Sequence, residues 1–343
     1  MPVTANRPYR SRSWIGIVAM LLAAAAGSQA TSAQTSSLRF VSTAWAPFTN
    51  EAGKPRFALD LVEEALRRVN VKITTSIVDP AQFTTALLSG PFDGTAAAWR
   101  DAERERALVF SKPYLENRLI LVGRRGADVS APSLSALAGK RVAIVGGYSY
   151  GDLIDAAGPT FVRSQSEEDS LSLLLGSKVE YTLMDELVVH YILTNHPSEA
   201  QARLQLGAKP LITRQLYLAV RRSVPDAAAI VDHFNAQVRN LIADGTYHRL
   251  LHVDWITADI DGDGTPEYVA RSTQAGKTAP ITAYPLISID EGLKQQRVQV
   301  SPHFYIGGAF YNSWTDVPDN YKVSTDRPAI SRSTGSVFTF TWK

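Results

Sequence analysis

Hydrophobic positions follow two different spacings along the first two thirds of the chain, and their alternation predicts strands followed by helices. Residues 38–43 form a short apolar run typical of a strand, and residues 58–70 repeat apolar side chains at i, i+3, i+4 and i+7. Asp60 and Glu63 stand at the spacing of a helix-capping pair. A strand, a helix that ends at Gly90 and another strand follow. This order indicates a mainly parallel sheet with helices on its faces.

The same order of strands and helices begins again near residue 118. Residues 118–125 read as an extended segment, and a turn-rich loop then leads to a second set of strands. Residues 170–186 repeat the architecture of residues 84–101, with a helix, a glycine stop, an acid and an apolar strand that ends in polar residues. Residues 225–245 form a further helix, for which Asp244 and Gly245 are the stop.

The repeated architecture predicts an α/β fold with two lobes. We expect residues 38–123 and 216–252 to form lobe 1 and residues 124–215 to form lobe 2, joined by two extended crossovers. Ligands of open α/β sheets bind beyond the carboxyl ends of the strands, so polar residues there should face a cleft.

The pattern changes after His252. Residues 257–343 contain short β-like runs separated by Gly, Pro, Asn and Asp, and Phe338, Phe340 and Trp342 share one face of the last run. We expect a β-rich C-terminal extension, either packed on one lobe or forming a small separate module.

The first 33 residues are typical of a secretory signal peptide. Arg7, Arg10 and Arg12 precede a short apolar run, and small residues then allow cleavage after Ala30 or Ala33. This segment carries three arginines and no acid, so the formal charge of +2 falls to −1 in the mature chain. A nearly neutral surface offers no electrostatic footprint for nucleic acid.

The chain contains no cysteine among its 343 residues. This excludes disulfides, thiol chemistry and the lipidated cysteine that tethers some exported proteins. We therefore expect a protein free in an extracytoplasmic space, and a bacterial periplasm fits best.

Several motifs occur in a matched order. They are "WAPF", "RFALDLVEEAL", "AAAWRDAERERALVFSKPY", "AGKRVAIVGGYSYGD", "KVEYTLMDE" and the helical segment that ends at Leu251. From Leu38 to Leu251 the chain resembles the family 3 extracellular solute-binding proteins, the periplasmic receptors of amino-acid ABC importers. The resemblance implies the two-lobe periplasmic binding protein type II fold. It also implies a monomer that captures an amino acid or related small carboxylate and delivers it to a membrane ABC permease.

The resemblance also implies a ligand site. Arg104, six residues before Phe110, corresponds to the arginine that clamps the ligand carboxylate, and a guanidinium presents two parallel donors to such a group. Asp185 corresponds to the partner of the ligand ammonium, and the face of Trp45 would cover the ligand. Each residue also has a purely structural alternative: Arg104 on a solvent-exposed charged face of a helix, Asp185 as a helix cap and Trp45 as a core side chain.

The second lobe supplies two further candidate residues, and two other segments depart from the family pattern, the first being "RFA" at Arg56 to Ala58, where the family has G-F-[DE]. Tyr148 and Ser149 follow Gly147 where the family has two hydroxyl residues, and the Ser149 hydroxyl with the helix N-terminus can still receive a carboxylate. The loop before Arg104 is one residue shorter, so Trp99 and Arg100 stand where the family has small hydroxyl residues. These changes favour a more anionic or aromatic ligand.

Two rival functions remain at this stage. One is a periplasmic lyase resembling cyclohexadienyl dehydratase on the same fold, which would need a cleft acid or base with a shifted pKa. We find no catalytic triad and assign no catalytic residue, so no enzyme is expected. The other rival is a ligand sensor or interaction protein that uses the aromatic extension.

The stretch "DIDGDGTPEYVA", residues 259–270, matches a calcium loop. The twelfth position holds Ala270 in place of the usual glutamate, and the flanks look extended. We expect a weak structural Ca²⁺ site, on the order of 10⁻⁴ to 10⁻³ M, with a plain acidic turn as the alternative and no cofactor for function. The expected ligands are Asp259, Asp261, Asp263, Thr265 and Glu267.

Overall fold

The computed structural model describes Met1 and most of the chain from residue 36 to residue 322. The described ranges are 36–151, 154, 158–251, 255–261, 265–270, 284–285 and 303–322. The cleavage sites of the predicted signal peptide, Asp263 and the aromatic run at 338–342 lie outside the described residues. None of the described helices combines the length and the apolar character that a membrane crossing needs.

A nine-stranded sheet forms the centre of the described chain up to residue 221. Its order is β2-β1-β3-β9-β5-β8-β6-β7, and β4 also pairs with β9. The strands are β1 Ser36–Thr43, β2 Val71–Val78, β3 Gly94–Ala98, β4 Leu108–Phe110, β5 Leu115–Arg124, β6 Arg141–Val145, β7 Thr160–Ser164, β8 Tyr181–Asp185 and β9 Leu204–Arg221.

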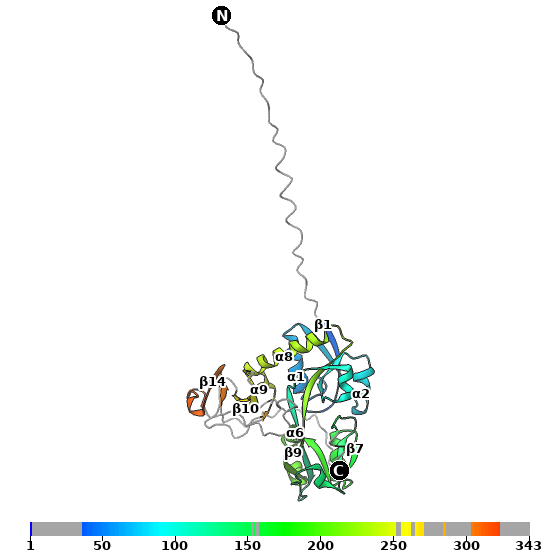
Figure 1. Cartoon of the computed structure of the whole chain (residues 1–343). Helices are drawn as coiled ribbons and strands as arrows, with labels where there is room; N and C mark the ends of the chain where they lie inside the picture. Colours follow the sequence, from blue (N-terminus) through cyan, green and yellow to red (C-terminus); the bar gives the residue numbers. More distant parts are fainter. Residues whose placement is uncertain are drawn as a thin grey trace. The chain divides into compact units, whose positions relative to one another are not determined.

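The sheet has two halves, and each combines parallel outer strands with antiparallel pairs to β9 or β5. In the first half, formed by β1 to β4 with the end of β9, β1 is parallel to β2 and β3. In the second half, formed by β5 to β8 with the start of β9, β6 is parallel to β7 and β8. β5 and the start of β9 are antiparallel to each other, and the long strand β9 then continues into the first half (Figure 1). They are the two extended crossovers that the sequence predicts, while the exact lobe boundaries stay a prediction.

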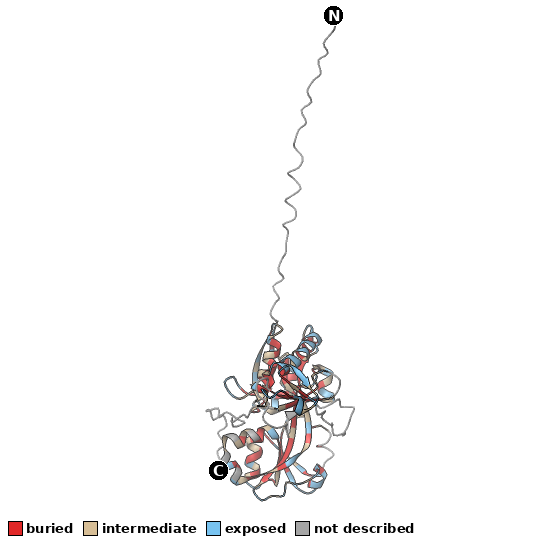
Figure 2. Cartoon of the chain, turned by 90° about the vertical axis from the view of Figure 1, so that its left-hand side faces the viewer, coloured by how far each residue is buried: buried red, intermediate tan, exposed pale blue. Residues whose placement is uncertain are grey.

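Helices cover the faces of the sheet, and both the helices and the strands contain buried residues (red in Figure 2). The helices are α1 Phe57–Arg67, α2 Pro80–Ser89, α3 Ala102–Ala107, η1 Leu134–Leu137, α5 Glu167–Leu175, α6 Glu186–Asn195, α7 Pro197–Arg203, α8 Ala227–Ala243 and α9 Thr246–Leu251.

Helix α1 shows how the apolar spacing produces burial. Val62, Ala65 and Leu66 are fully buried, as the spacing predicts. The capping pair predicted at Asp60 and Glu63 is wrong, because the helix begins one turn earlier and Arg56 is its N-cap residue. Asp60 lies inside the first turn, where its carboxylate accepts a hydrogen bond from Arg56 at 3.0 Å.

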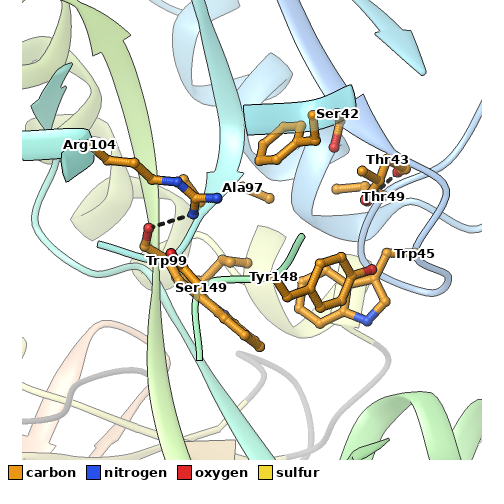
Figure 3. Close-up of a pocket in the computed structure, with 12 residues that line it drawn as sticks. Ser42, Thr43, Trp45, Thr49, Ala97, Trp99, Arg104, Tyr148 and Ser149 are labelled. Carbon is orange, nitrogen blue, oxygen red and sulfur yellow. Dashed lines mark hydrogen bonds between the residues drawn. The ribbon is translucent and has the colours of Figure 1, made fainter. Parts of the chain in front are cut away.

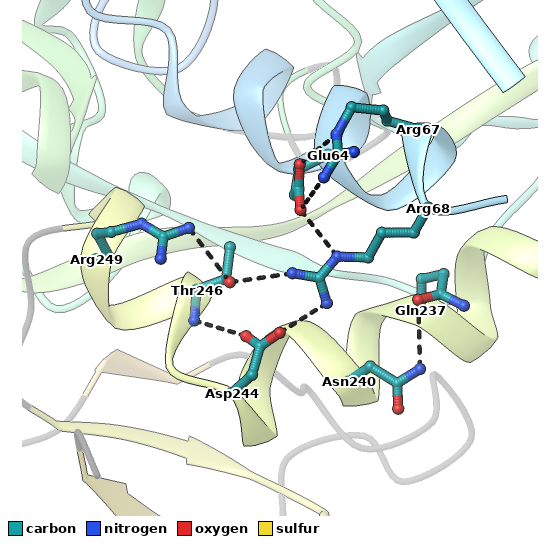
Figure 4. Close-up of polar contacts among 8 residues, drawn as sticks. All are labelled: Glu64, Arg67, Arg68, Gln237, Asn240, Asp244, Thr246 and Arg249. Atoms are coloured by element: carbon teal, nitrogen blue, oxygen red, sulfur yellow. Dashed lines mark hydrogen bonds and ion pairs between the residues drawn. The ribbon is translucent and has the colours of Figure 1, made fainter. Parts of the chain in front are cut away.

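A polar network fixes the last helices on the first half. The Arg68 guanidinium at the end of α1 donates to Glu64 Oε1 at 2.9 Å, to Asp244 Oδ2 at 2.7 Å and to Thr246 Oγ1 at 3.3 Å (Figure 4). Asp244 ends α8 and Thr246 begins α9, so one side chain holds three helix ends together. The chain that follows therefore leaves the first half in a defined direction.

The extension begins as a second sheet that packs on α9. Its order is β12-β10-β11-β13-β14. Ile256 and Val269 belong to the same hydrophobic core as the nine-stranded sheet, and buried His248 lies 3.0 Å from the Val269 carbonyl through Nε2. Residues 255–261 and 265–270 are therefore docked on the domain. The remaining elements are β10 Trp255–Ala258, β11 Glu267–Ala270, β12 Tyr284–Pro285, β13 Phe304–Ile306, β14 Ala309–Tyr311 and η2 Trp314–Asp316.

Candidate ligand-binding site

A cavity lies where the carboxyl ends of β1, β3 and β6 meet (Figure 3). Its space, including the solvent-open mouth, is about 380 Å³. The edge of the sheet is the place predicted from the sequence, because parallel strands end there in both halves. The lining residues are Ser42, Thr43, Trp45, Thr49, Phe83, Ala97, Ala98, Trp99, Arg104, Tyr148, Ser149 and Leu216.

Arg104 contributes a buried guanidinium to the wall of this cavity. The residue is only 3% exposed. Its Nη1 donates to the Trp99 carbonyl at 2.9 Å (Figure 3). Its Nη2 donates to Thr84 Oγ1 at 3.1 Å. Burial lowers the pKa of Arg104, yet a guanidinium starts so high that it stays charged. A guanidinium has five N–H donors, so this one retains donors for a ligand carboxylate.

Asp101 places a carboxylate of the protein itself beside that guanidinium. Its Oδ2 lies 3.5 Å from Arg104 Nε, and its Oδ1 caps α3 by accepting the Arg104 backbone N–H at 2.8 Å. The Ser149 hydroxyl from the second half also donates to Asp101. Burial raises the pKa of Asp101, but these hydrogen bonds and the charge of Arg104 outweigh it and leave the pKa lowered. Asp101 thus links both halves of the sheet at the cavity.

Four aromatic side chains, which we call the aromatic cluster, fill the space between the halves: Trp45, Trp99, Tyr148 and Tyr150. Their rings meet edge to face, with centroids 5.9 Å apart for Trp45 and Trp99 and 5.7 Å apart for each of these with Tyr148. The Tyr150 ring lies 5.3 Å from that of Trp99. Three of the four line the cavity, so a ligand enters against aromatic faces and edges.

Asp185 does not line the cavity. This carboxylate ends β8, is 1% exposed and accepts three hydrogen bonds, from Leu187 N at 2.8 Å, Arg118 N at 3.0 Å and Asn117 Nδ2 at 3.1 Å. Burial raises its pKa to about 7. The helix-cap role is present in the structure, while its contact with a ligand ammonium stays a prediction. Hydrogen bonds still connect Asp185 to the cavity through Asn117, because the lining residue Trp99 donates from Nε1 to Asn117 Oδ1 at 2.7 Å.

Arg100 also lies outside the lining residues. Its guanidinium forms an ion pair with Glu105, and its carbonyl accepts a hydrogen bond from Arg214 at 2.8 Å. The structure therefore brings Trp45, Trp99, Arg104, Tyr148 and Ser149 together and leaves Arg100 beside them. The guanidinium that favoured an anionic ligand is already paired.

Gly147 explains how the loop that carries Tyr148 comes so close to the first half. Its φ of +82° suits glycine, and a Cβ added there would lie 2.5 Å from the Pro80 carbonyl oxygen at the start of α2. Any side chain at this position would push the two halves apart.

Asp101, Asn117 and Tyr150 shape the site but were not predicted as ligand-site residues. The same holds for the lining residues Ser42, Thr43, Thr49, Phe83, Ala97, Ala98 and Leu216. The spacing of Asp101 and Arg104 indicates an N-cap, so that signal was available in the sequence. Asn117 and Tyr150 carry no comparable local signal, because their contacts with Trp99 join residues that are distant in the chain.

The calcium loop lies in the β10–β11 hairpin, away from the cavity residues. Carboxylate oxygens of Asp259, Asp261 and Glu267 lie within 4.8 Å of one another. Glu267 is 2% exposed and accepts the Ile260 backbone N–H at 3.0 Å. Strands flank the loop on both sides, as the sequence predicts. With Asp263 outside the described residues, metal binding stays a prediction.

Comparison with known proteins identifies the fold. The chain is similar to a mutant of ArgBP from T. maritima, with 23% identity and a TM-score of 0.53 over 63% of this chain and 93% of that chain. It is also similar to the GluR0 ligand-binding core from Nostoc punctiforme in complex with L-glutamate, with 19% identity and a TM-score of 0.52 over 62% and 96%. An ancestral arginine-binding protein bound to glutamine gives 25% identity and a TM-score of 0.52 over 62% and 95%.

These structures share the two-lobe type II periplasmic binding protein fold that the sequence resemblance implies. No curated protein matches the chain. Residues 40–257 match the bacterial extracellular solute-binding proteins, family 3. Because this match spans more than half of the chain, the protein belongs to the bacterial extracellular solute-binding proteins, family 3.

Proposed function

We propose that the protein captures an amino acid or a closely related small carboxylate in the cavity beside Arg104. The observation that carries this proposal is the buried guanidinium in the cavity wall, which has spare donors and lies next to aromatic faces. The similar structures support it, since one is a complex with L-glutamate and another is an ancestral arginine-binding protein bound to glutamine.

Recognition begins with the carboxylate of the ligand. Arg104 supplies charge-assisted hydrogen bonds to it, and Ser149 supplies a hydroxyl from the other half. In this structure the Asp101 carboxylate contacts both the Arg104 guanidinium and the Ser149 hydroxyl. When a ligand binds, the Ser149 hydroxyl therefore leaves Asp101 or is shared between Asp101 and the ligand. The halves open and close by bending in β5 and β9, the strands that connect them.

The biological setting follows from the family. Members of an extracellular solute-binding family act outside the cytoplasm. We propose export by the signal peptide with cleavage near Ala30 or Ala33, action in the periplasm as a monomer and delivery of the ligand to a membrane ABC permease.

Arg104→Ala tests the carboxylate clamp. A panel of L-amino acids is screened by thermal shift and then by calorimetry. We expect at least one amino acid to raise Tm, and Arg104→Ala to weaken its binding about 30-fold or more, because a buried charge partner is worth about 2 kcal/mol or more. Arg106→Ala, an exposed arginine on the same helix, is the matched control and should change affinity less than about threefold.

Two outcomes contradict the proposal. The first is a panel in which no amino acid stabilises the protein. The second is an Arg104→Ala variant that binds as tightly as the Arg106→Ala control.

Binding without chemical conversion is part of the proposal. Asp185 has a raised pKa, as a general acid needs, but it lies outside the cavity lining and its oxygens cap a helix and bond to Asn117. Chromatography of the bound ligand after overnight incubation should return it unchanged. A product that accumulates in proportion to protein concentration would instead establish the lyase.

We further propose that the loop between β10 and β11 binds Ca²⁺ as a structural ion. The clustered carboxylates of Asp259, Asp261 and Glu267 are oxygen ligands of the kind that Ca²⁺ prefers. Millimolar Ca²⁺ should raise Tm and a chelator should reverse the rise, whereas Asp261→Asn should abolish it. A Tm that changes neither with Ca²⁺ nor with chelator contradicts the proposal.

A further inference from the structure

Glu167 is a buried acid that the carboxylate clamp does not use. It is the first residue of α5, at the carboxyl end of β7, and is 8% exposed. Among the described residues, Glu167 forms no ion pair, and its Oε2 makes no hydrogen bond. An unpaired buried carboxyl destabilises a fold, so its presence calls for a reason.

The charged groups that act on Glu167 are other acids. Burial, together with the nearby charges of Glu168 on the same helix and Asp185 at the end of β8, raises the pKa of Glu167 to about 8. Arg104, the buried cation of the cavity, is already paired with Asp101. Among the described residues, therefore, no cation acts on Glu167 or Asp185, although the Arg214 guanidinium lies over the Trp99 ring, 5.9 Å from its centroid.

The aromatic cluster separates Glu167 from the cavity. Trp45 lines the cavity, and its indole also lies beside the Glu167 carboxyl and lowers its pKa. The buried Trp45 indole nitrogen acts on the Glu167 carboxyl as a hydrogen-bond donor would, but the contact does not meet hydrogen-bond geometry, and neither this nitrogen nor Glu167 Oε2 has another partner among the described residues. In Figure 3 this nitrogen lies on the side of the ring away from Ser42 and Thr43. The charge of Glu167 also raises the pKa of Tyr148 and Tyr150, so both rings lie within its field.

A carboxylate behind aromatic rings is an arrangement that recognises cations. Ring faces attract an ammonium or guanidinium, and the attraction increases when the site is dry. A cation that displaces the Trp45 indole would meet the open oxygen of Glu167 and satisfy both buried groups.

We propose that Glu167 is the counter-ion for a cationic group of the ligand, so that the cleft takes a basic amino acid with its carboxylate at Arg104 and its cationic side chain in the aromatic cluster. This proposal rests on the proposed function and adds the class of ligand and a specificity-determining residue.

A purely structural role for Glu167 is the alternative. Acids in the first turn of a helix interact favourably with the helix dipole, and Glu167, Glu168 and Asp169 all stand there. Glu168→Gln therefore serves as the matched control, because it removes an acid from the same turn and leaves the buried carboxyl in place.

The experiment compares basic, neutral and acidic ligands on the full chain. Calorimetry with L-arginine, L-lysine, L-citrulline, L-glutamine and L-glutamate should show arginine or lysine binding about tenfold or more tightly than the neutral pair. Glu167→Gln should reduce this preference to less than about threefold, whereas Glu168→Gln should preserve it. Thermal unfolding of each variant confirms that it is folded.

Proton release supplies a readout that a structural role would not change. At pH 7 a carboxyl with a pKa of about 8 is mostly protonated, so binding a cation should release about one proton per ligand. Binding enthalpies in phosphate and in Tris measure that number. Asp185, with a pKa of about 7, contributes in every variant that retains it, so the decisive quantity is the release lost in Glu167→Gln.

The outcomes separate this proposal from the proposed function. If neutral or acidic amino acids bind and the basic ones do not, or if Glu167→Gln keeps the preference and the proton release, Glu167 is not the counter-ion and the amino-acid receptor stands. If no amino acid binds, the proposed function fails as well.

Discussion

The two halves of the sheet beside the cleft, which we call its two walls together with the buried residues behind the cavity lining, handle buried charge in opposite ways. On the first half, Arg104 and Asp101 pair with each other, and the pKa of Asp101 is lowered. On the second half, Asp185 and Glu167 are both buried acids without a cationic partner in the described residues, and both have raised pKa values. One wall already satisfies its own charges, and the other is incomplete until something positive arrives.

The difference within the second wall is equally instructive. Asp185 receives three hydrogen bonds and is held in place by Leu187, Arg118 and Asn117. Glu167 has an oxygen with none. Equal burial and equal chemistry therefore give one acid that stabilises the fold and another that is available to a ligand.

Asp185→Ala should have the largest effect on stability. It leaves the side chain of Asn117 and two backbone N–H groups without their acceptor in a buried place, which should reduce the free energy of unfolding by about 3 kcal/mol or more. Urea unfolding measures it. Glu167→Ala is the comparison, and it should cost less because no hydrogen bond of Oε2 is lost. Equal losses for the two variants would remove the distinction between these acids.

The pH dependence of stability should come mainly from the second wall. The folded-state pKa of Glu167 is raised from 4.5 to about 8 and that of Asp185 from 3.8 to about 7. Folding therefore favours their protonated forms, so this stability is present below about pH 4 and is lost as the pH rises to about 8. Glu167→Gln should reduce the decline between pH 5 and pH 8 by more than about 1.4 kcal/mol, the equivalent of one pKa unit. Asp101 has a lowered pKa, so its contribution is lost only as the pH falls through that pKa.

The close approach of the walls at Gly147 gives a smaller prediction. Gly147→Ala should weaken ligand binding about tenfold, because the new Cβ meets the Pro80 carbonyl and keeps the halves apart. Gly126→Ala is the matched control, since Gly126 has a φ of +83° and nothing within 4 Å of an added Cβ. Both variants should lose similar stability from backbone strain. Equal affinities for the two would show that closure does not pass through this contact.

The order of elements was predictable because apolar spacing is a local property. The strands of both halves, helix α8 with its stop at Asp244 and the extended flanks of the calcium loop all follow the predicted segments. The first turn of α1 was placed wrongly, because several polar residues there compete as caps and the chain before them decides which one is used.

The site was predictable only in part. Arg104, Trp45, Trp99, Tyr148 and Ser149 are gathered at one cavity as the resemblance implies. The hydrogen bonds from Asn117 and Arg118 to Asp185 depend on the pairing of β5 with β8, and no local pattern in the sequence predicts that pairing.

The unsatisfied state of Glu167 was not predictable at all. Three consecutive acids after Ser166 give the same helix-start signal, and only tertiary packing against Trp45 buries the first of them and leaves the next two half-buried.

A crossed titration decides whether the two walls hold opposite ends of one ligand. Calorimetry of L-arginine, L-citrulline and agmatine, which lacks the carboxylate, is performed on the unmodified chain, on Arg104→Ala and on Glu167→Gln. Arg104→Ala should abolish the preference for arginine over agmatine and preserve the preference for arginine over citrulline. Glu167→Gln should preserve the preference over agmatine and abolish the preference over citrulline. Variants that lose both preferences together, or neither, would contradict the division of the cleft into an anion-binding and a cation-binding wall.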